Sequence, residues 1–155
     1  AGFYYKTFMW PKSFWYRVYE PFIRKAAGLG VVSTKHDKER YEHKYEYCDL
    51  LIAGSGPSGL ASAYAAAKNG ARVILAEDKP RFGGSLLTSD VNIGNQSGED
   101  WANSIISELK QLPNVVVKNR SQVFGYYDHN MLVMSEKVSD HLPKTKNSPP
   151  KKRLW

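Results

Sequence analysis

A strand–helix–strand unit built around a glycine-rich turn constrains the fold of this chain more than any other feature. Residues 48–84 read CDLLIAGSGPSGLASAYAAAKNGARVILAEDKPRFGG. The apolar run 49–53 predicts a buried strand, and 72–76 predicts a second one. Between them, an alanine-rich stretch predicts a helix over 58–69 that ends at Gly70. A G-x-G-x-x-G turn joins the first strand to the helix, which is the context of a dinucleotide-binding fingerprint.

Each position of the turn has a physical role in binding a diphosphate. Gly54 permits the tight turn out of the strand, and Gly56 lets a pyrophosphate approach the backbone. Gly59 lets the helix pack closely on the strands. Pro57 suits a first helical turn, where its missing N–H loses no bond. Ser58 and Gly59 open the helix, where free N–H groups and the helix dipole favour an anion.

An acidic residue follows the second strand at the distance that such a site requires. Glu77 lies 18 residues beyond Gly59 (77 − 59). A carboxylate there can accept hydrogen bonds from both hydroxyls of an adenosine ribose. It would also repel a 2′-phosphate, which favours NAD or FAD over NADP.

A second glycine pair extends the motif. The pattern V-x-L-x-E followed by Gly83-Gly84 resembles the two-dinucleotide-binding flavoprotein family, in which this Gly-Gly turn lies close to the cofactor diphosphate. FAD and NAD both use such a unit, so the unit alone leaves both open. The predicted cofactor-binding residues are Gly54, Gly56, Pro57, Ser58, Gly59, Glu77, Asp78, Arg81, Gly83, Gly84, Ser85 and Val123.

Later segments complete a predicted α/β fold. An amphipathic pattern predicts a helix over 98–112, and Val115 to Lys118 predicts a third parallel strand. Residues 122–138 predict a hairpin that belongs to a β-meander. The expected architecture is a three-layer, Rossmann-like FAD/NAD(P)-binding domain that is incomplete at its C-terminal end.

The chain divides into three parts by composition. Residues 1–30 form an aromatic-rich helical segment, with a helix over 12–27 kinked or divided at Pro21. Residues 31–47 are a polar connector, and 48–155 are the partial dinucleotide-binding domain. The aromatic residues either pack on that domain or form an interface with a partner. Those crowding the first fifteen positions are Phe3, Tyr4, Tyr5, Phe8, Trp10, Phe14 and Trp15.

Composition excludes several classes of protein. A hydrophobic fraction of 42% over 155 residues is enough for one core. No apolar run reaches the ~18 residues of a membrane span, and no signal peptide is evident. The single Cys48 excludes an internal disulfide and a cysteine metal site. We therefore expect a cytoplasmic protein without a membrane partner.

The formal charge of +7 raises nucleic acid as an alternative partner. Much of the excess lies near the end of the chain, however, with no nucleic-acid motif around it. We therefore predict no nucleic-acid binding. The cations concerned are Lys144, Lys146, Lys151, Lys152 and Arg153.

The aromatic block carries a more specific resemblance. The stretches GFYYKTFMWPKSFW, VYEPFIRKAAGLG and RYEHKYEYCDLLIAGSGPSGLASA resemble the α subunit of heterotetrameric sarcosine oxidase. This resemblance implies a flavoenzyme complex that oxidatively demethylates sarcosine to glycine, a one-carbon unit and hydrogen peroxide. In that family the α-subunit site holds NAD, FAD lies in the β subunit, and FMN lies at the α/β boundary. The expected partners are a dinucleotide, the β subunit and other subunits.

The resemblance also implies a fragment that is inactive by itself. Such an α subunit has a ferredoxin-like segment before the aromatic block and ends in a domain that handles tetrahydrofolate; neither is present here. Two alternatives stay open: an FAD-binding fragment of a related amino-acid oxidase or dehydrogenase, and a non-catalytic assembly module. The sequence offers no acid–base pair, nucleophile or metal-ligand cluster, so we assign no catalytic or metal-binding residue.

Overall fold

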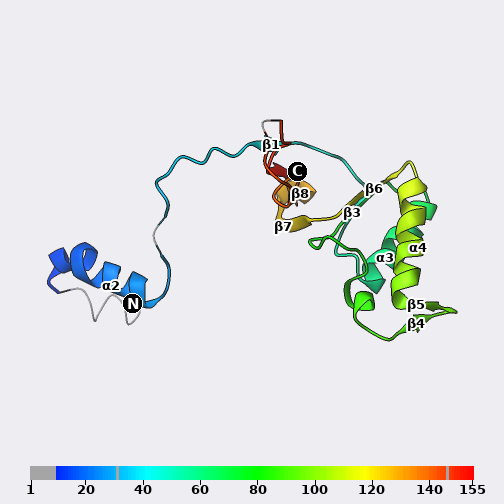
Figure 1. Cartoon of the computed structure of the whole chain (residues 1–155), viewed down its shortest axis with the longest axis horizontal. Coiled ribbons are helices and arrows are strands. Elements are labelled where there is room, and N and C mark those ends of the chain that lie inside the picture. Colours follow the sequence, from blue (N-terminus) through cyan, green and yellow to red (C-terminus); the bar gives the residue numbers. More distant parts are fainter. Residues whose placement is uncertain (1–9, 31, 146) are drawn as a thin grey trace. The chain divides into compact units, whose positions relative to one another are not determined.

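The computed structural model describes residues 10–30, 32–145 and 147–155. They belong to two units, Ala1–Lys38 and Glu39–Trp155, which can be followed along the chain in Figure 1. Four of the aromatic residues named above lie outside the described residues, so the structure does not test their role. These are Phe3, Tyr4, Tyr5 and Phe8.

The first unit is helical over most of the range that the sequence predicted. A 3-10 turn (η1, Lys12–Phe14) leads into a π-helical turn (η2, Trp15–Tyr19), and an α-helix (α2, Glu20–Ala26) follows. Pro21 falls in the first turn of α2, where its missing N–H breaks no hydrogen bond. The backbone stays helical through Tyr19 and Glu20, so the chain changes helix type ahead of Pro21 and is not divided there. Gly28 follows the helix in a left-handed conformation with φ 68°.

None of the described residues of this unit is buried. Trp10, Tyr16 and Phe22 are exposed to 86%, 81% and 73%. The aromatic side chains at positions 10–26 thus form no core of their own. Both interpretations of the aromatic segment remain predictions.

The second unit contains a parallel sheet with the strand order β2-β3-β6. Leu50 lies opposite Val73, and Val73 lies opposite Val115. This pairing confirms the three predicted parallel strands. The strands are β2 (Leu50–Ala53), β3 (Val73–Ala76) and β6 (Val115–Lys118).

Two helices, α3 (Pro57–Lys68) and α4 (Gly98–Gln111), pack together over one face of this sheet. Both are crossover helices between parallel strands, and the right-handed rule places them on the same side. Their inner side chains meet β3 in one apolar core. Its buried members are Leu60, Ala63, Ala67, Val73, Leu75, Leu86, Ala102, Ile105, Ile106 and Leu109.

Local sequence explains where these helices begin and end. The Oγ of Ser97 accepts a hydrogen bond from the Asp100 N–H at 3.1 Å, which caps α4. The carboxylates of Glu99 and Asp100 lie in the first turn, where they complement the helix dipole. Gly70 adopts φ 87° after α3, and its N–H donates to the Ala67 carbonyl.

A second sheet has the order β1-β9-β8-β7. Strands β7, β8 and β9 form the predicted antiparallel meander, and β1 adds parallel to β9. Figure 1 shows the β7–β8 hairpin on the opposite side of β3 and β6 from the helices, which gives three layers. The strands are β1 (Tyr41–His43), β7 (Ser121–Tyr127), β8 (Met131–Lys137) and β9 (Lys152–Leu154).

Strand β1 lies inside the range that the sequence assigned to a polar connector, residues 31–47. Tyr41 pairs with Lys152, and His43 pairs with Leu154. The polar segment therefore contains a short strand, which the sequence did not reveal because a three-residue strand that pairs through its backbone shows no apolar periodicity.

Short elements fill the remaining loops. The segment between β3 and α4 contains a 3-10 turn and a two-strand hairpin, and the β7–β8 turn contains another 3-10 turn. These elements are η3 (Gly84–Leu87), β4 (Asn92–Ile93), β5 (Gln96–Ser97) and η4 (Asp128–Asn130). None of the described helices combines the length and apolar character that crossing a membrane requires.

Candidate dinucleotide-binding site

The glycine turn leaves β2 and enters α3 through backbone geometry that side chains would obstruct. Gly54 has φ 101°, and its N–H donates to the Ala76 carbonyl at 2.7 Å. Gly56 is the N-cap of α3. A Cβ on Gly59 would overlap the Gly54 carbonyl oxygen, so the helix packs against the turn as closely as a glycine allows.

Gly56 and Gly84 bring two separate turns into contact. A Cβ on Gly84 would lie 2.9 Å from the Gly56 Cα, and Gly84 itself has φ 55°. A Cβ on Gly56 would meet nothing within 4 Å, so the space in front of its backbone is open. The first turn of α3 therefore presents free N–H groups beside an open surface, which suits a diphosphate.

Glu77 is buried behind this turn, with 5% of its surface exposed. Its Oε2 accepts hydrogen bonds from the Ser55 N–H at 2.8 Å and from the Ser55 Oγ at 2.5 Å. Its Oε1 accepts the Lys79 N–H at 3.0 Å. Three protein donors thus hold the carboxylate that the sequence assigned to ribose recognition.

Ser55 is a site residue that the sequence analysis missed. It is fully buried, and both its Oγ and its carbonyl oxygen accept the Gly83 N–H at 3.1 Å. It occupies a variable position of G-x-G-x-x-G, so the glycine pattern gives it no role. The feature that could have identified it is its hydroxyl side chain, which follows β2 just as Glu77 follows the neighbouring strand β3.

A cavity of about 260 Å³ lies beyond the carboxyl ends of β2 and β3. Three of the predicted residues, Gly54, Asp78 and Val123, line it, whereas Glu77 does not. Ser121 and Gln122, which the sequence analysis did not select, form part of its wall at the start of β7. The lining residues are Ala53, Gly54, Ala76, Asp78, Ser121, Gln122 and Val123.

A second hollow of about 240 Å³ shares Asp78 and Gln122 with the first. Three cationic side chains line it, from Lys79, Arg120 and Lys137. Arg120 adopts a left-handed φ of 52°. Hydrogen bonding to the Glu77 carboxyl and then to Lys79 lowers the pKa of Asp78 below its ordinary value. The hollow therefore combines the Asp78 carboxylate with three cationic side chains.

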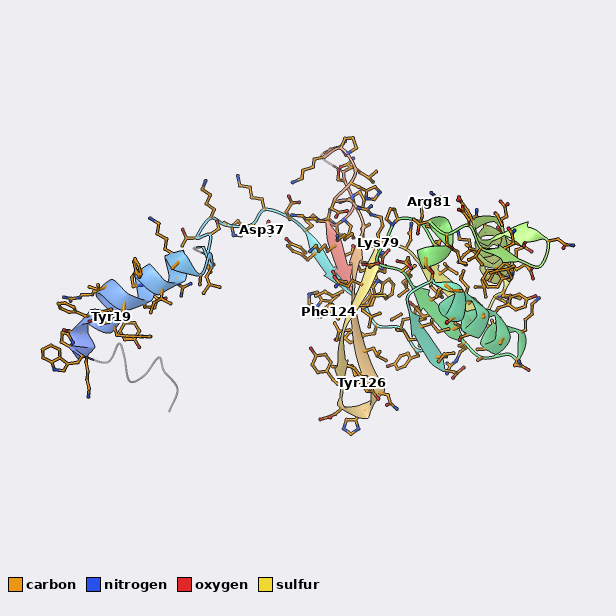
Figure 2. All side chains as sticks on the ribbon, turned by 90° about the horizontal axis from the view of Figure 1, so that it is seen from below. Tyr19, Asp37, Lys79, Arg81, Phe124 and Tyr126 are labelled. Carbon is orange, nitrogen blue, oxygen red and sulfur yellow. The ribbon has the colours of Figure 1, made fainter. Side chains whose placement is uncertain are left out.

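The remaining predicted residues lie nearby with other contacts. Arg81 pairs with Glu99 at the start of α4, and Figure 2 shows Arg81 and Lys79 on the connection that follows β3. Ser85 lies in η3, where its carbonyl accepts the Thr88 N–H. Pro57 and Ser58 occupy the first turn of α3.

The arrangement provides binding groups and no reactive pair. Open backbone at Gly56 and the α3 N-terminus fit a diphosphate, and the adjoining cavity offers polar edges to a nucleoside. Among the described residues, no cluster of three or more His, Cys, Asp or Glu side chains could hold a metal ion. The chemistry that this surface suits is the binding of a dinucleotide.

Comparison with known proteins agrees with this description. Residues 49–131 match the family described as FAD dependent oxidoreductase. The chain is 46% identical, over its whole length, to the sarcosine oxidase subunit alpha of Rhizobium meliloti (strain 1021). It is 34% identical over 75% of its length to the same subunit of Corynebacterium sp. (strain U-96). The chain spans 16% and 12% of the lengths of these two relatives.

A solved structure supports the fold. L-proline dehydrogenase from P. horikoshii superposes with a TM-score of 0.51 at 17% identity, over 66% of this chain and 21% of that one. At this identity the likeness concerns the fold alone.

Proposed function

This chain belongs to the FAD-dependent oxidoreductase family, and from that premise we propose that its glycine turn holds the adenosine diphosphate half of a dinucleotide cofactor. The observation that carries the proposal is the open backbone at Gly56, which faces the N-terminus of α3 and abuts Gly84. Gly84 lies against this opening, and Pro57 and Ser58 begin α3 beside it. The cavity with Asp78 and Val123 would receive the adenosine end.

We propose FAD as the dinucleotide. The family match supports FAD, whereas the sequence analysis put NAD first because of the resemblance to sarcosine oxidase. When bound, FAD supplies a flavin ring that takes two electrons from a donor. The residues of this chain bind and orient the adenosine diphosphate half. The FMN of the related complex and a cytoplasmic location stay predictions.

At the level of the whole enzyme, we propose an oxidoreductase of the sarcosine oxidase type, acting on the CH–NH group of an amine donor. The 46% identity over the complete chain supports this reading. Sarcosine as substrate, a β-subunit partner and tetrahydrofolate as a one-carbon acceptor are part of the same proposal. This chain contributes dinucleotide binding to such a complex.

The test is equilibrium binding of FAD, NAD and NADP to the 155-residue chain. Gly56→Val should abolish binding and leave the fold intact, because the new side chain would fill space that the protein leaves open. Ala61→Val adds the same side chain on an exposed position of α3 and should bind as the wild type does. If a folded Gly56→Val variant bound FAD with unchanged affinity, FAD would not bind at this glycine turn.

The choice of cofactor is read from the same titrations. A yellow complex with flavin absorbance supports FAD, whereas saturable NAD binding without FAD binding would restore the NAD assignment. The Glu77 carboxylate should disfavour NADP against NAD. Glu77→Gln should narrow that difference, and equal affinity of the wild type for NADP and NAD would remove this role from Glu77.

A second candidate function is assembly. The exposed Trp10, Tyr16 and Phe22 favour it, because aromatic side chains in water are costly at ~25 cal/mol per Å² of apolar surface. An interface would cover them in an oligomeric oxidase. Light scattering should then show self-association of the isolated chain, which replacement of these three residues by serine relieves. A monodisperse wild-type monomer whose residues 10–26 are strongly protected from hydrogen exchange would identify them as core.

A further inference from the structure

The hollow of about 240 Å³ collects three cationic side chains from three separate segments. Lys79 follows β3, Arg120 lies in the turn between β6 and β7, and Lys137 ends β8. None of the three belongs to the glycine turn at the start of α3. The diphosphate site described above therefore does not account for this cluster.

Backbone hydrogen bonds hold these three residues side by side. The Arg120 N–H donates to the Lys79 carbonyl at 3.1 Å, and the Arg120 carbonyl accepts the Lys137 N–H at 2.9 Å. Between these two contacts Arg120 adopts its left-handed φ of 52°. A residue other than glycine keeps such a conformation only where its surroundings fix it. The fold itself therefore brings the three cations together.

The acids beside the hollow do not balance its positive charge. Asp78 Oδ2 lies 3.3 Å from Lys79 Nζ, and Asp140 Oδ1 lies 2.8 Å from Arg120 Nη2. Among the described residues, no carboxylate forms an ion pair with the Lys137 ammonium. Three cations against two acids leave one positive charge in excess, and like charges held close together repel. Binding of an anion would relieve this repulsion.

Arg120 also has a donor without an acceptor. Its Nη2 donates to Asp140, whereas its Nε is buried and has no hydrogen-bond partner among the described residues. A buried donor that lacks an acceptor lowers stability. A guanidinium presents its donors in a planar fork that matches the oxygens of a phosphate, and each lysine adds a point charge. A phosphate group, with several acceptor oxygens and a charge of about −2, fits this set of donors.

We propose that this hollow is a phosphate-binding site, held by Lys79, Arg120 and Lys137 and separate from the site of the dinucleotide diphosphate. Asp78 and Gln122 line both this hollow and the cavity assigned to adenosine, so the bound phosphate would lie beside the cofactor. The phosphate comes from free phosphate or a phosphate ester; a 2′-phosphate on the dinucleotide is the other source of the same chemistry. The site goes beyond the proposed function and does not depend on it.

The first experiment titrates the 155-residue chain with inorganic phosphate at constant ionic strength. We expect saturable binding of one phosphate per chain and a melting temperature that rises with phosphate concentration. Lys137→Gln should fold, because its backbone bond to Arg120 remains, and should bind phosphate about tenfold more weakly. Lys110→Gln, on α4 outside the hollow, removes the same charge and should bind as the wild type does. Unchanged affinity in folded Lys137→Gln, or an equal loss in both variants, would overturn the proposal.

The second experiment separates the sources of the phosphate. With FAD at saturation, inorganic phosphate should bind with similar affinity, and displacement of phosphate by FAD would place it at the diphosphate turn and overturn a separate site. Adenosine 2′,5′-bisphosphate should bind no tighter than 5′-AMP. A gain that Lys137→Gln abolishes would assign the hollow to a 2′-phosphate of the dinucleotide and would also overturn a separate site. Phosphate binding that depends on Lys137 in a chain that fails to bind FAD would support this inference and contradict only the proposed function.

Discussion

The parallel sheet and the meander sheet are stabilised by different kinds of contact. All four residues of β3 are buried, and α3 and α4 pack aliphatic side chains against two of them, Val73 and Leu75. In the second sheet, Ser121 and Met134 are the buried residues of the four strands. Its β7–β8 hairpin exposes Phe124 and Tyr126, which Figure 2 labels along the strand.

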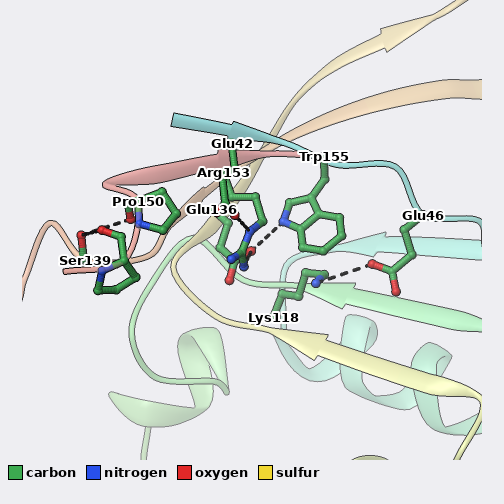
Figure 3. Close-up of polar contacts among 9 residues, drawn as sticks. Glu42, Glu46, Lys118, Glu136, Ser139, Pro150, Arg153 and Trp155 are labelled. Carbon is green, nitrogen blue, oxygen red and sulfur yellow. Dashed lines mark hydrogen bonds and ion pairs between the residues drawn. The ribbon is translucent and has the colours of Figure 1, made fainter. Parts of the chain in front are cut away.

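Polar contacts replace the apolar core in the second sheet. Glu136 Oε2 accepts the Trp155 Nε1–H at 2.6 Å and the Arg153 Nη1–H at 3.4 Å. Arg153 also donates from Nε to Glu42 at 2.9 Å, which joins β1 to β9. Figure 3 shows these side chains together. Charges and hydrogen bonds, with little buried apolar area, therefore connect β1, β8 and β9.

Lys118 extends this network to the parallel sheet. Its Nζ lies 3.6 Å from the centre of the Trp155 ring and 3.5 Å from Glu46 Oε2. The side chain is 12% exposed, so the cation–π contact is largely shielded from water. Because Lys118 ends β6, the polar network links the two sheets at the strand ends.

The difference between the two sheets shows which part of the site is held by apolar packing and which part is held by polar contacts. The diphosphate turn is built on the apolar layer, in which packing holds the backbone independently of pH and salt. The opposite wall of the cavity comes from Ser121–Val123 at the start of the meander. The two walls should respond differently to mutation, pH and salt.

The largest effect should come from the apolar layer. Leu75 is fully buried in the central strand, so Leu75→Ala leaves a cavity and should lower the free energy of unfolding by about 4 kcal/mol. Met134→Ala is the matched change in the meander and should cost about 2 kcal/mol, because fewer buried neighbours surround it. Urea titrations of both variants give the comparison. A larger loss of unfolding free energy for Met134→Ala than for Leu75→Ala would contradict the view that the parallel sheet is the more tightly packed one.

The same contrast explains how much could be predicted from sequence. The sequence predicted the strands and helices of the apolar layer, which are β2, β3, β6, α3 and α4. It did so because apolar runs mark buried segments and glycines mark the turns between them. Strand β1 was not, because its pairing with β9 uses the backbone of a polar segment. The contact of Ser55 with Glu77 also escaped prediction, since it depends on how two turns meet in space and not on a spacing.

Gly59→Ala should be the next most damaging change. Its Cβ would overlap the Gly54 carbonyl oxygen, and backbone atoms on both sides cannot move apart cheaply. We expect a loss of about 3 kcal/mol in the free energy of unfolding. Gly56→Ala is the matched control, because the added Cβ meets nothing within 4 Å. Equal stability of the two alanine variants, measured by thermal unfolding, would contradict the close packing of α3.

A smaller effect is expected in the polar network. Glu136→Gln keeps the side-chain volume and one acceptor but removes the charge that faces Arg153 and Trp155. The expected loss is about 1 kcal/mol, and it should shrink in 1 M salt as the charges are screened. Asp90→Asn, at an exposed loop position outside this network, controls for loss of an acid. A salt-independent loss as large as that of Leu75→Ala would mean that the meander depends on packing after all.

The smallest effect tests a charge contact on the apolar layer itself. Asp49, before β2, accepts hydrogen bonds from the Arg72 N–H at 2.8 Å and Nη2 at 2.7 Å. These bonds lower the pKa of Asp49 from 3.8 to about 2. Because the Asp49 carboxyl has a lower pKa in the folded chain than in the unfolded chain, its ionised form stabilises the fold at pH values above the unfolded pKa. This contribution to stability is lost as the pH falls from about 4 to 2. Asp49→Asn should therefore be slightly less stable than the wild type at pH 6, with the two converging below pH 3 in denaturant titrations. Asp90→Asn, at an exposed loop position, should show no such convergence. If the stability difference between Asp49→Asn and the wild type stayed constant from pH 6 to pH 3, the effect of the substitution would come from side-chain shape and not from charge. The stability of the apolar layer would then be independent of pH up to its edge at Asp49.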